Sequence, residues 1–301
     1  MIPLRILYIA VHEGNAGWGA ETFLASALEA LGHTVIRVDY RAHRHELPAV
    51  LDQVVLYDPH IVLLQRGERF PLHLLTAVAP VKVYYATEGA SDQDQRQVLQ
   101  SGAFDAYVAA SRTTLSYMVE ECRISTASAF HIPSAFDPGV YRAETFPVEY
   151  DVAAVWNWTK RRKQAFGSLG WRVHRKAAHS GLYGAACNDV FNRSRIVLNI
   201  HRSETLDTET RLFELLPTNA AIVSEECDAP ELFEDAGIHW FRRGDWKEMR
   251  RLVQLLLRED GARVDSVRRN NALAPHHTWM ARAASFTRLF EELYTQWRQA
   301  S

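Results

Sequence analysis

The sequence predicts an α/β protein with two Rossmann-like domains, each built on a doubly wound parallel sheet. Three observations lead to this class. The chain has 301 residues, which is enough for two domains of ordinary size. Short apolar segments alternate with amphipathic ones along its length, as strands and helices do in parallel α/β proteins. A stretch with two prolines and a glycine, 132–141, divides this series into two halves.

Composition and charge exclude several classes of protein. Hydrophobic residues make up 47% of the chain and charged residues 23%, which does not fit a disordered, collagen-like or coiled-coil protein. Lysine plus arginine (34) nearly balances aspartate plus glutamate (36), for a net charge of −2, so strong nonspecific binding of nucleic acid is not expected. The three cysteines, Cys122, Cys187 and Cys227, form no CxxC pair, which argues against a disulfide framework or a cysteine-rich zinc site.

Membrane and secretion signals are not found in the sequence. No segment has the apolar length of a membrane helix, and the N-terminus lacks the basic start and the cleavage site of a signal peptide. We therefore expect a cytoplasmic protein without a transmembrane segment.

The first half reads as a complete parallel α/β domain. Residues 5–11 are a continuous apolar run, a glycine loop follows at 14–19, and an amphipathic segment over 22–31 precedes the next apolar run at 34–39. This order is one βαβ unit. Further strands are expected at 61–64, 81–86, 104–110 and 129–132, with a helix over 112–121.

The second half repeats the pattern after the proline-rich stretch. Strands are expected at 150–156, 171–174, 195–200, 220–224 and 238–241, and helices from 160 and over 183–191, 210–216, 246–257 and 281–297. We therefore place the first domain at 1–140 and the second at 141–280.

The glycine loop is the first candidate binding segment. Gly14, Gly17 and Gly19 follow a strand and precede a helix, where a backbone without side chains can approach a phosphate or a sugar. Their spacing is GxxGxG, whereas the dinucleotide fingerprint is GxGxxG. Asp39 ends the second strand, where a ribose-binding acid would lie, so nicotinamide binding remains a weak alternative. A tight turn without a ligand is equally open.

A second candidate lies after the strand that ends near His201. A polar, acid-rich loop follows, and a helix begins at Thr210; ligands of open α/β sheets bind at such carboxyl ends of strands. Arg211 in the first helical turn is unfavourable for the helix dipole, and a bound diphosphate would remove this conflict. Glu214 is on the same helix face and could bind a ribose. The alternative is an Arg211–Glu214 surface ion pair.

The run Lys160-Arg161-Arg162-Lys163 opens the first helix of the second half. Four cations at a strand-to-helix turn could clamp phosphates. The alternative is a solvated, charged start of a helix.

Acid–base and metal chemistry have few candidates. His12, Asp39 and Glu88 lie at predicted strand ends and could each act as a general base, although a lone histidine is more often structural. The adjacent His276 and His277 do not share a helix face, so a metal site there is not expected. Asp92 lies in a polar loop before a helix and is expected to cap it.

Five stretches share a pattern with one protein family. They are the loop 14–21, the strand 104–111, the linker Ile132-Pro133-Ser-Ala-Phe-Asp137, the run Ile196-Val-Leu-Asn199-Ile-His201 with Thr210-Arg211-Leu-Phe213-Glu214 and 220–224 after it, and His277-Thr278-Trp279 with Arg282. Together they resemble the GT-B glycosyltransferases, and most closely their CgeB-like, family 4-like group (glycosyl transferases group 1).

The resemblance implies a fold and a reaction. In the GT-B fold two Rossmann-like domains face each other across a cleft, and a final helix, here 281–301, crosses back to the first domain. The first domain would bind the acceptor and the second a nucleotide-diphosphate sugar. The resemblance implies hexosyl transfer from this donor with retention of configuration, without a metal or a cofactor. The acceptor stays open among a glycan, a small molecule, a protein and, less expected, DNA.

The resemblance also assigns site residues. The donor-binding residues would be Gly17, Gly19, Lys160, Arg161, His201, Thr210, Arg211 and Glu214. Glu88 and His12 would be the acid or base on the acceptor side, and Arg211 would stabilise the leaving diphosphate.

Two other functions stay open. The family has glycines where this chain has Trp156 and Asn219, and an acidic residue where it has Leu206. These differences would suit a GT-B-shaped binding or assembly protein without catalysis. An NAD-dependent oxidoreductase would instead use the glycine loop and Asp39.

Overall fold

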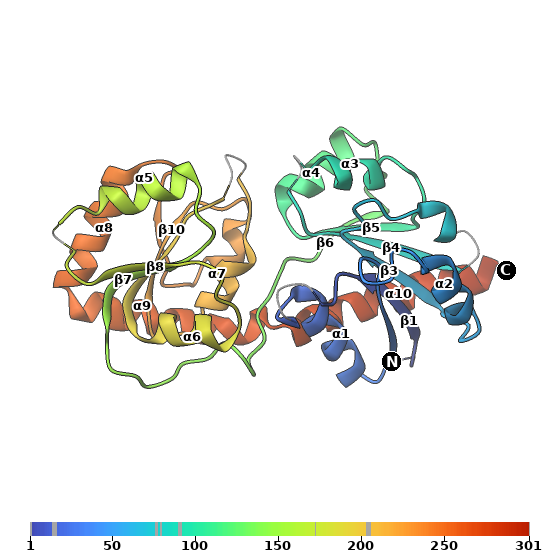
Figure 1. Ribbon diagram of the computed structural model, residues 1–301, viewed down its shortest axis with the longest axis horizontal. Coiled ribbons are helices and arrows are strands. Elements are labelled where there is room, and N and C mark those ends of the chain that lie inside the picture. Colours follow the sequence, from blue (N-terminus) through green and yellow to red (C-terminus); the bar gives the residue numbers. More distant parts are fainter. Residues whose placement is uncertain are drawn as a thin grey trace. The chain divides into compact units, whose positions relative to one another are not determined.

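The chain forms two compact units in the computed structural model, and each is described by itself (Figure 1). The structure describes residues 2–13, 17–75, 78, 80–89, 92–171, 173–202 and 206–300. Unit 1 consists of Met1–Ser134 with Trp279–Ser301, and unit 2 of Ala135–Thr278. The last helix of the chain therefore belongs to the same unit as the first strand.

Unit 1 is built on a six-stranded parallel sheet in the order β2-β1-β3-β4-β5-β6. Its strands are β1 (Arg5–Ala10), β2 (Thr34–Asp39), β3 (Ile61–Gln65), β4 (Val81–Ala86), β5 (Ala106–Ala109) and β6 (Ala129–His131). Ile6 of β1 pairs with Val35 on one side and with Ile61 on the other. The apolar runs of β1, β3 and β4 are buried on both faces, as parallel strands require.

Helices cover both faces of the unit 1 sheet. They are α1 (Ala20–Ala30), α2 (Leu47–Val55), the 3₁₀ turn η2 (Leu72–Leu75), α3 (Gln93–Leu99), α4 (Arg112–Glu120) and α10 (Trp279–Ala300). Helices α2, α3 and α4 share one core with Leu7 and Ile9 of β1. Helices α1 and α10 pack together on the other face, where the Tyr85 and Phe286 rings lie 5.0 Å apart.

Unit 2 has a five-stranded parallel sheet in the order β11-β10-β9-β7-β8. Its strands are β7 (Tyr150–Val155), β8 (Lys176–His179), β9 (Ser194–Asn199), β10 (Ala221–Glu225) and β11 (His239–Phe241). Its helices are α5 (Lys160–Ser168), α6 (Ala185–Asn192), α7 (Thr210–Leu215), α8 (Trp246–Arg258) and α9 (Asp260–Leu273), with the 3₁₀ turns η3 (Pro230–Phe233) and η4 (Ala274–His277).

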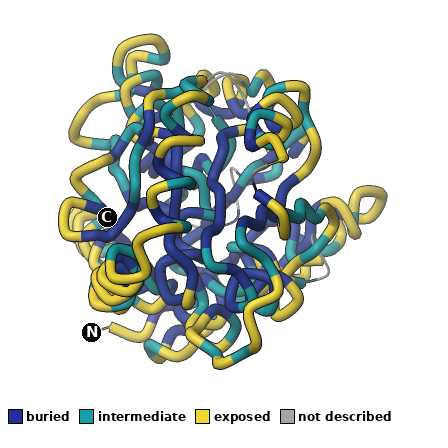
Figure 2. Tube along the Cα trace, turned by 90° about the vertical axis from the view of Figure 1, so that its left-hand side faces the viewer, coloured by how far each residue is buried: buried dark blue, intermediate teal, exposed yellow. Residues whose placement is uncertain are grey.

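The two faces of the unit 2 sheet have separate cores. Val152 and Ala154 of β7 face a core shared with α5 and α8. The alternate residues, Ala153 and Val155, face a core shared with α6 and α7. Figure 2 shows the consequence: buried residues follow the strands, and exposed residues lie on the helices and loops around them.

The α/β class with two parallel, helix-covered sheets is confirmed. The strand expected at 171–174 is wrong: residues 171, 173 and 174 are outside the strands, and β8 begins at Lys176, which pairs with Val152 of β7. Trp171 is 78% exposed. Helix α9 was not expected, because it buries the polar residues Ser266 and Asn270 and has no apolar stripe. Both bond to Gly237, through Ser266 Oγ to the carbonyl and Gly237 N–H to Asn270 Oδ1.

Each sheet has one point where the strand order reverses. In unit 1 the chain goes from β1 to β2 on one side and to β3 on the other, and in unit 2 it goes from β7 to β8 and then to β9. In open α/β sheets the crevice at the carboxyl ends of these strands is where ligands bind. The candidate sites therefore lie after β1 and β3 in unit 1, and after β7 and β9 in unit 2.

Candidate functional site

Arg162 joins the two strand ends at the unit 2 reversal point. Its Nε donates to the Ile200 carbonyl after β9 (2.8 Å) and its Nη1 to the Asn157 carbonyl after β7 (3.3 Å). The guanidinium lies over the Trp156 ring, 5.7 Å from its centroid, and the side chain is only 8% exposed. Thr159 caps α5 by accepting from the Arg162 N–H (3.2 Å), so the backbone and side chain of Arg162 are both fixed.

Glu209 holds the loop that follows β9. Its carboxylate accepts from Arg162 Nη2 (3.1 Å) and from the Arg202 N–H (2.8 Å). It also lies 3.7 Å from His201 Nδ1. Burial alone would lower the pKa of His201, but the nearby Glu209 carboxylate, together with the Glu226 carbonyl and Glu225, outweighs it and raises that pKa. The other ring nitrogen of His201 hydrogen-bonds the Glu226 carbonyl (2.8 Å).

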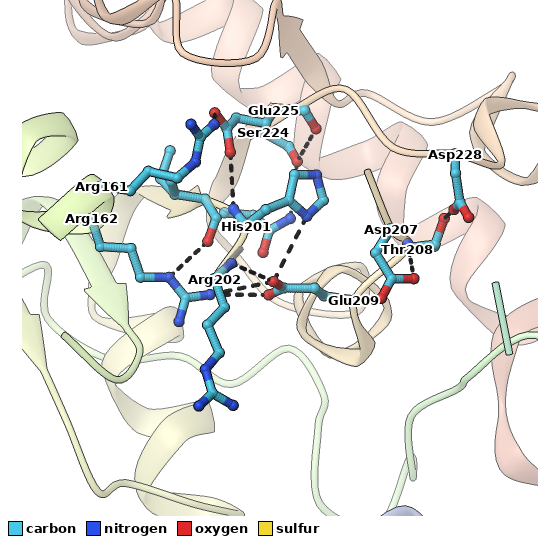
Figure 3. Close-up of polar contacts among 12 residues, drawn as sticks. Arg161, Arg162, His201, Arg202, Asp207, Thr208, Glu209, Ser224, Glu225 and Asp228 are labelled. Carbon is cyan, nitrogen blue, oxygen red and sulfur yellow. Dashed lines mark hydrogen bonds and ion pairs between the residues drawn. The ribbon is translucent and has the colours of Figure 1, made fainter. Parts of the chain in front are cut away.

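Glu225 is a fully buried carboxylate at the end of β10. It accepts from the His201 N–H (2.9 Å) and from the Gly244 N–H (3.0 Å), and it forms an ion pair with Arg161. The Arg161 guanidinium lies over the Trp246 ring at 5.1 Å. Figure 3 shows Arg161 and Arg162 converging from α5 on Glu225 and Glu209, with His201 between the two carboxylates.

Arg211 and Glu214 form a second, smaller cluster on α7. Arg211 Nη1 lies 2.6 Å from Glu214 Oε2, with side-chain exposures of 22% and 13%. The Arg211 guanidinium lies over the Phe191 ring of α6 at 5.3 Å. Burial, and after it the charge of Glu214, raises the pKa of Tyr141. The pair is thus half-buried against α6, not a fully exposed ion pair.

The structure brings some predicted residues of unit 2 together. Glu225 joins Arg161 to the His201 backbone, while Arg211 and Glu214 contact each other. Thr210 begins α7 and is partly buried, and Lys160 begins α5 and is exposed. Sequence reasoning missed Glu225 and Glu209, whose partners lie far away along the chain; the available signal was a carboxylate directly at a strand end or helix start.

At two positions of the unit 1 glycine loop, steric constraints explain why the residue is a glycine. Gly17 has φ +80°, a region that other residues adopt only with strain. Gly19 is the N-cap of α1, and a Cβ there would lie 2.5 Å from Glu21 Oε2. Gly14, the third predicted glycine, lies outside the described residues.

Glu88 belongs to a charged cluster after β3 and β4. It forms an ion pair with Arg66 Nη2 (2.5 Å), and Arg66 Nε lies 3.2 Å from Glu68. Glu21 interacts electrostatically with all three, and burial raises the pKa of its carboxyl group. Arg66 and Glu21 were not predicted as site residues.

His12 lies apart from this cluster, beside Asp39. Its Nε2 bonds the Tyr8 carbonyl (3.1 Å), and burial lowers its pKa below the ordinary 6.5, so the ring is neutral at pH 7. Asp39 accepts from the N–H groups of Glu13 (2.9 Å), Arg41 (2.9 Å) and Ala42 (3.0 Å). Asp39 therefore joins the loops after β1 and β2.

Two further expectations concern capping and metals. Asp92 accepts from the Gln95 N–H (2.8 Å), which confirms it as the cap of α3. Within the described ranges, no cluster of three or more His, Cys, Asp or Glu side chains could hold a metal ion. In the same residues, no helix is long and apolar enough to cross a membrane.

Part of the chain matches a known protein family. Residues 152–288 match the family described as Glycosyl transferase-like. Among curated proteins, none matches the chain.

Several solved structures resemble the chain along nearly its whole length. A glycosyltransferase from Rickettsia africae has a TM-score of 0.71 at 9% identity, covering 97% of this chain and 99% of its own. Sucrose-phosphate synthase from Thermosynechococcus elongatus has a TM-score of 0.71 at 10% identity, and the match covers 97% of this chain and 100% of the synthase chain. Anabaena HepE in complex with UDP and glucose has a TM-score of 0.70 at 12% identity, and the match covers 96% of this chain and 100% of the HepE chain.

These likenesses show the fold, since all three identities are low. The narrower CgeB-like assignment stays a prediction. Residues 152–288, most of which lie in unit 2, match the glycosyl transferase-like family, and the chain has the fold of the GT-B glycosyltransferases.

Proposed function

We propose that this protein transfers a sugar from a nucleotide-diphosphate sugar to an acceptor, without a metal and with retention of configuration. The observation that carries the proposal is the reversal point of unit 2. Cationic and hydrogen-bonding groups gather there at the carboxyl ends of β7 and β9, inside the glycosyl transferase-like domain. The UDP and glucose bound by HepE, which has the same fold, support a donor of this kind.

The α7 cluster supplies the groups that such a donor needs. Glu214 would accept hydrogen bonds from the ribose hydroxyls. Arg211, now paired with Glu214 at 2.6 Å, would stabilise the diphosphate as the bond to the sugar breaks. A cation placed where negative charge develops lowers the barrier, because it needs no reorganisation during the reaction. Lys160 and Thr210 would line the same edge, and Gly17 and Gly19 of unit 1 stay predicted donor-binding residues.

Unit 1 would bind the acceptor. His12 is neutral at pH 7 because burial lowers its pKa, as a general base requires. Glu88 is the other candidate, and its ion pair with Arg66 fixes the carboxylate. The acceptor could be a glycan, a small molecule, a protein or, less expected, DNA.

Thermal unfolding with a ligand panel tests the donor site. UDP, GDP, TDP, ADP, CMP and NAD are each added to wild type, to Arg211→Ala, and to Arg268→Ala as a matched control. Arg268 is an exposed arginine of α9. A ligand at about 100 times its Kd stabilises by about 2.7 kcal/mol, a shift of several degrees.

The panel separates the three functions. One nucleoside diphosphate is expected to raise the Tm of wild type and of the control but not of Arg211→Ala. A shift with NAD alone would instead support an oxidoreductase. No shift with any nucleotide would contradict a donor site.

A further inference from the structure

In the basic run of α5, the two arginines are paired with carboxylates, whereas the two lysines are exposed. Its four cations, 160–163, occupy the first turn of a nine-residue helix, the end where the helix dipole disfavours positive charge. Glu225 neutralises Arg161, and Glu209 neutralises Arg162. Lys160 and Lys163 are exposed. The two arginines of the run are therefore neutralised within the protein.

Moving either arginine to a phosphate would leave its carboxylate partner without a cation. Glu225 is fully buried, and a buried carboxylate that loses its cation is strongly destabilising. Arg162 would also abandon the Ile200 and Asn157 carbonyls that it joins. These arginines are thus suited to hold loops in place, which differs from the donor-binding role expected for Arg161.

Arg202 differs from Arg161 and Arg162, because its backbone is held by a carboxylate while the residue itself is exposed. Its N–H is held by Glu209 at 2.8 Å, so its backbone is fixed next to the reversal point between β7 and β9. The residue is exposed, and Figure 3 shows its guanidinium extending away from the carboxylate cluster. A fixed backbone with an exposed guanidinium suits a phosphate, which arginine binds through two parallel N–H groups.

We propose that Arg202 is a second cation, besides Arg211, through which unit 2 contacts the diphosphate of its donor, and that Arg161 and Arg162 are positioning residues for the backbone that carries it. This inference rests on the proposed function. Arg202 follows His201, whose N–H is held by Glu225. Glu225 and Glu209 therefore fix consecutive backbone N–H groups, those of residues 201 and 202.

Calorimetric titration tests this assignment. UDP, GDP, TDP and ADP, each beside its nucleoside, are titrated into wild type, Arg202→Gln, Arg202→Lys and the exposed control Arg268→Gln. The diphosphate that binds wild type is expected to bind Arg202→Gln roughly tenfold or more weakly, because a charge-assisted hydrogen bond is lost. The nucleoside affinity and the Tm without ligand are expected to stay the same. Arg202→Lys should recover part of the loss.

The positioning role gives a separate readout. Arg162→Gln is expected to lower the Tm without ligand, which Arg202→Gln does not. Equal diphosphate affinity in wild type and Arg202→Gln would overturn the assignment, as would an equal loss of nucleoside affinity. If no diphosphate binds wild type, the proposed function itself fails and this inference fails with it.

Discussion

Arg161 and Glu225 are 64 positions apart in the sequence and form an ion pair at the carboxyl edge of the unit 2 sheet. The Glu225 side chain is fully buried and that of Arg161 is 11% exposed. Because the same carboxylate accepts from Gly244 N–H, the pair holds the start of α5 and the loop before α8 at the end of β10.

The first prediction concerns the stability that this pair contributes. Glu225→Gln leaves the Arg161 charge buried without its partner, so the free energy of unfolding should fall by about 3 kcal/mol. Urea unfolding without ligand measures it. The double variant Glu225→Gln with Arg161→Gln should be less destabilised than the sum of the single variants. Strict additivity would show that the two side chains are not coupled.

The pH dependence of stability should report on His201. Glu209 raises the pKa of His201 in the folded protein, so folding favours the protonated ring. That contribution is fully present below the ordinary pKa of 6.5 and is lost as the pH rises through the raised value. The stability gap between wild type and His201→Gln should therefore shrink above pH 6.5. A gap that stays constant with pH would contradict the charged His201–Glu209 contact.

Glu214 should determine whether ribose is distinguished from deoxyribose. The proposed bonds to the ribose hydroxyls predict that wild type prefers UDP, or whichever diphosphate it binds, over the 2′-deoxy form. Glu214→Gln should lose about 1–2 kcal/mol of this preference. Binding isotherms for the two ligands measure it, with the exposed Glu234→Gln as control. An unchanged preference would remove Glu214 from the ribose site.

The glycine loop offers a steric test. A Cβ at Gly19 would lie 2.5 Å from Glu21 Oε2, so Gly19→Ala should destabilise by about 1–2 kcal/mol. In a Glu21→Ala background the cost should shrink. Gly17→Ala has open space but a φ of +80°, so its cost of about 1 kcal/mol should not depend on Glu21. Equal costs of Gly19→Ala in both backgrounds would be inconsistent with this contact.

The fold could be predicted because most of its strands can be recognised locally in the sequence, as short apolar runs. Buried parallel strands such as β1 and β3 read as continuous apolar runs. Strand β8 could not be found this way, because Lys176–His179 is short and only partly buried. Helix α9 packs through Ser266 and Asn270, which give no apolar period.

The site could be predicted only in part. Arg211 and Glu214 are three residues apart on one helix, so their contact follows from helical spacing. The partners of Arg161 and Arg162 come from other strands and loops, at separations of 64 and 47 positions. Contacts that depend on the order of strands in a sheet cannot be predicted from the local spacing of residues in the sequence.

Release of free diphosphate from a nucleotide-diphosphate sugar tests the central claim most directly. Purified protein is incubated with UDP-, GDP-, TDP- and ADP-sugars, with a chelator present, and NMR follows the diphosphate and the anomeric proton of the released sugar. The account predicts that one donor is slowly hydrolysed: water forms the new bond to the anomeric carbon as the bond to diphosphate breaks. The released sugar should first have the donor's configuration, and Arg211→Ala should be far slower. A donor that binds tightly but releases no diphosphate would contradict a transferase and favour a binding protein with this fold.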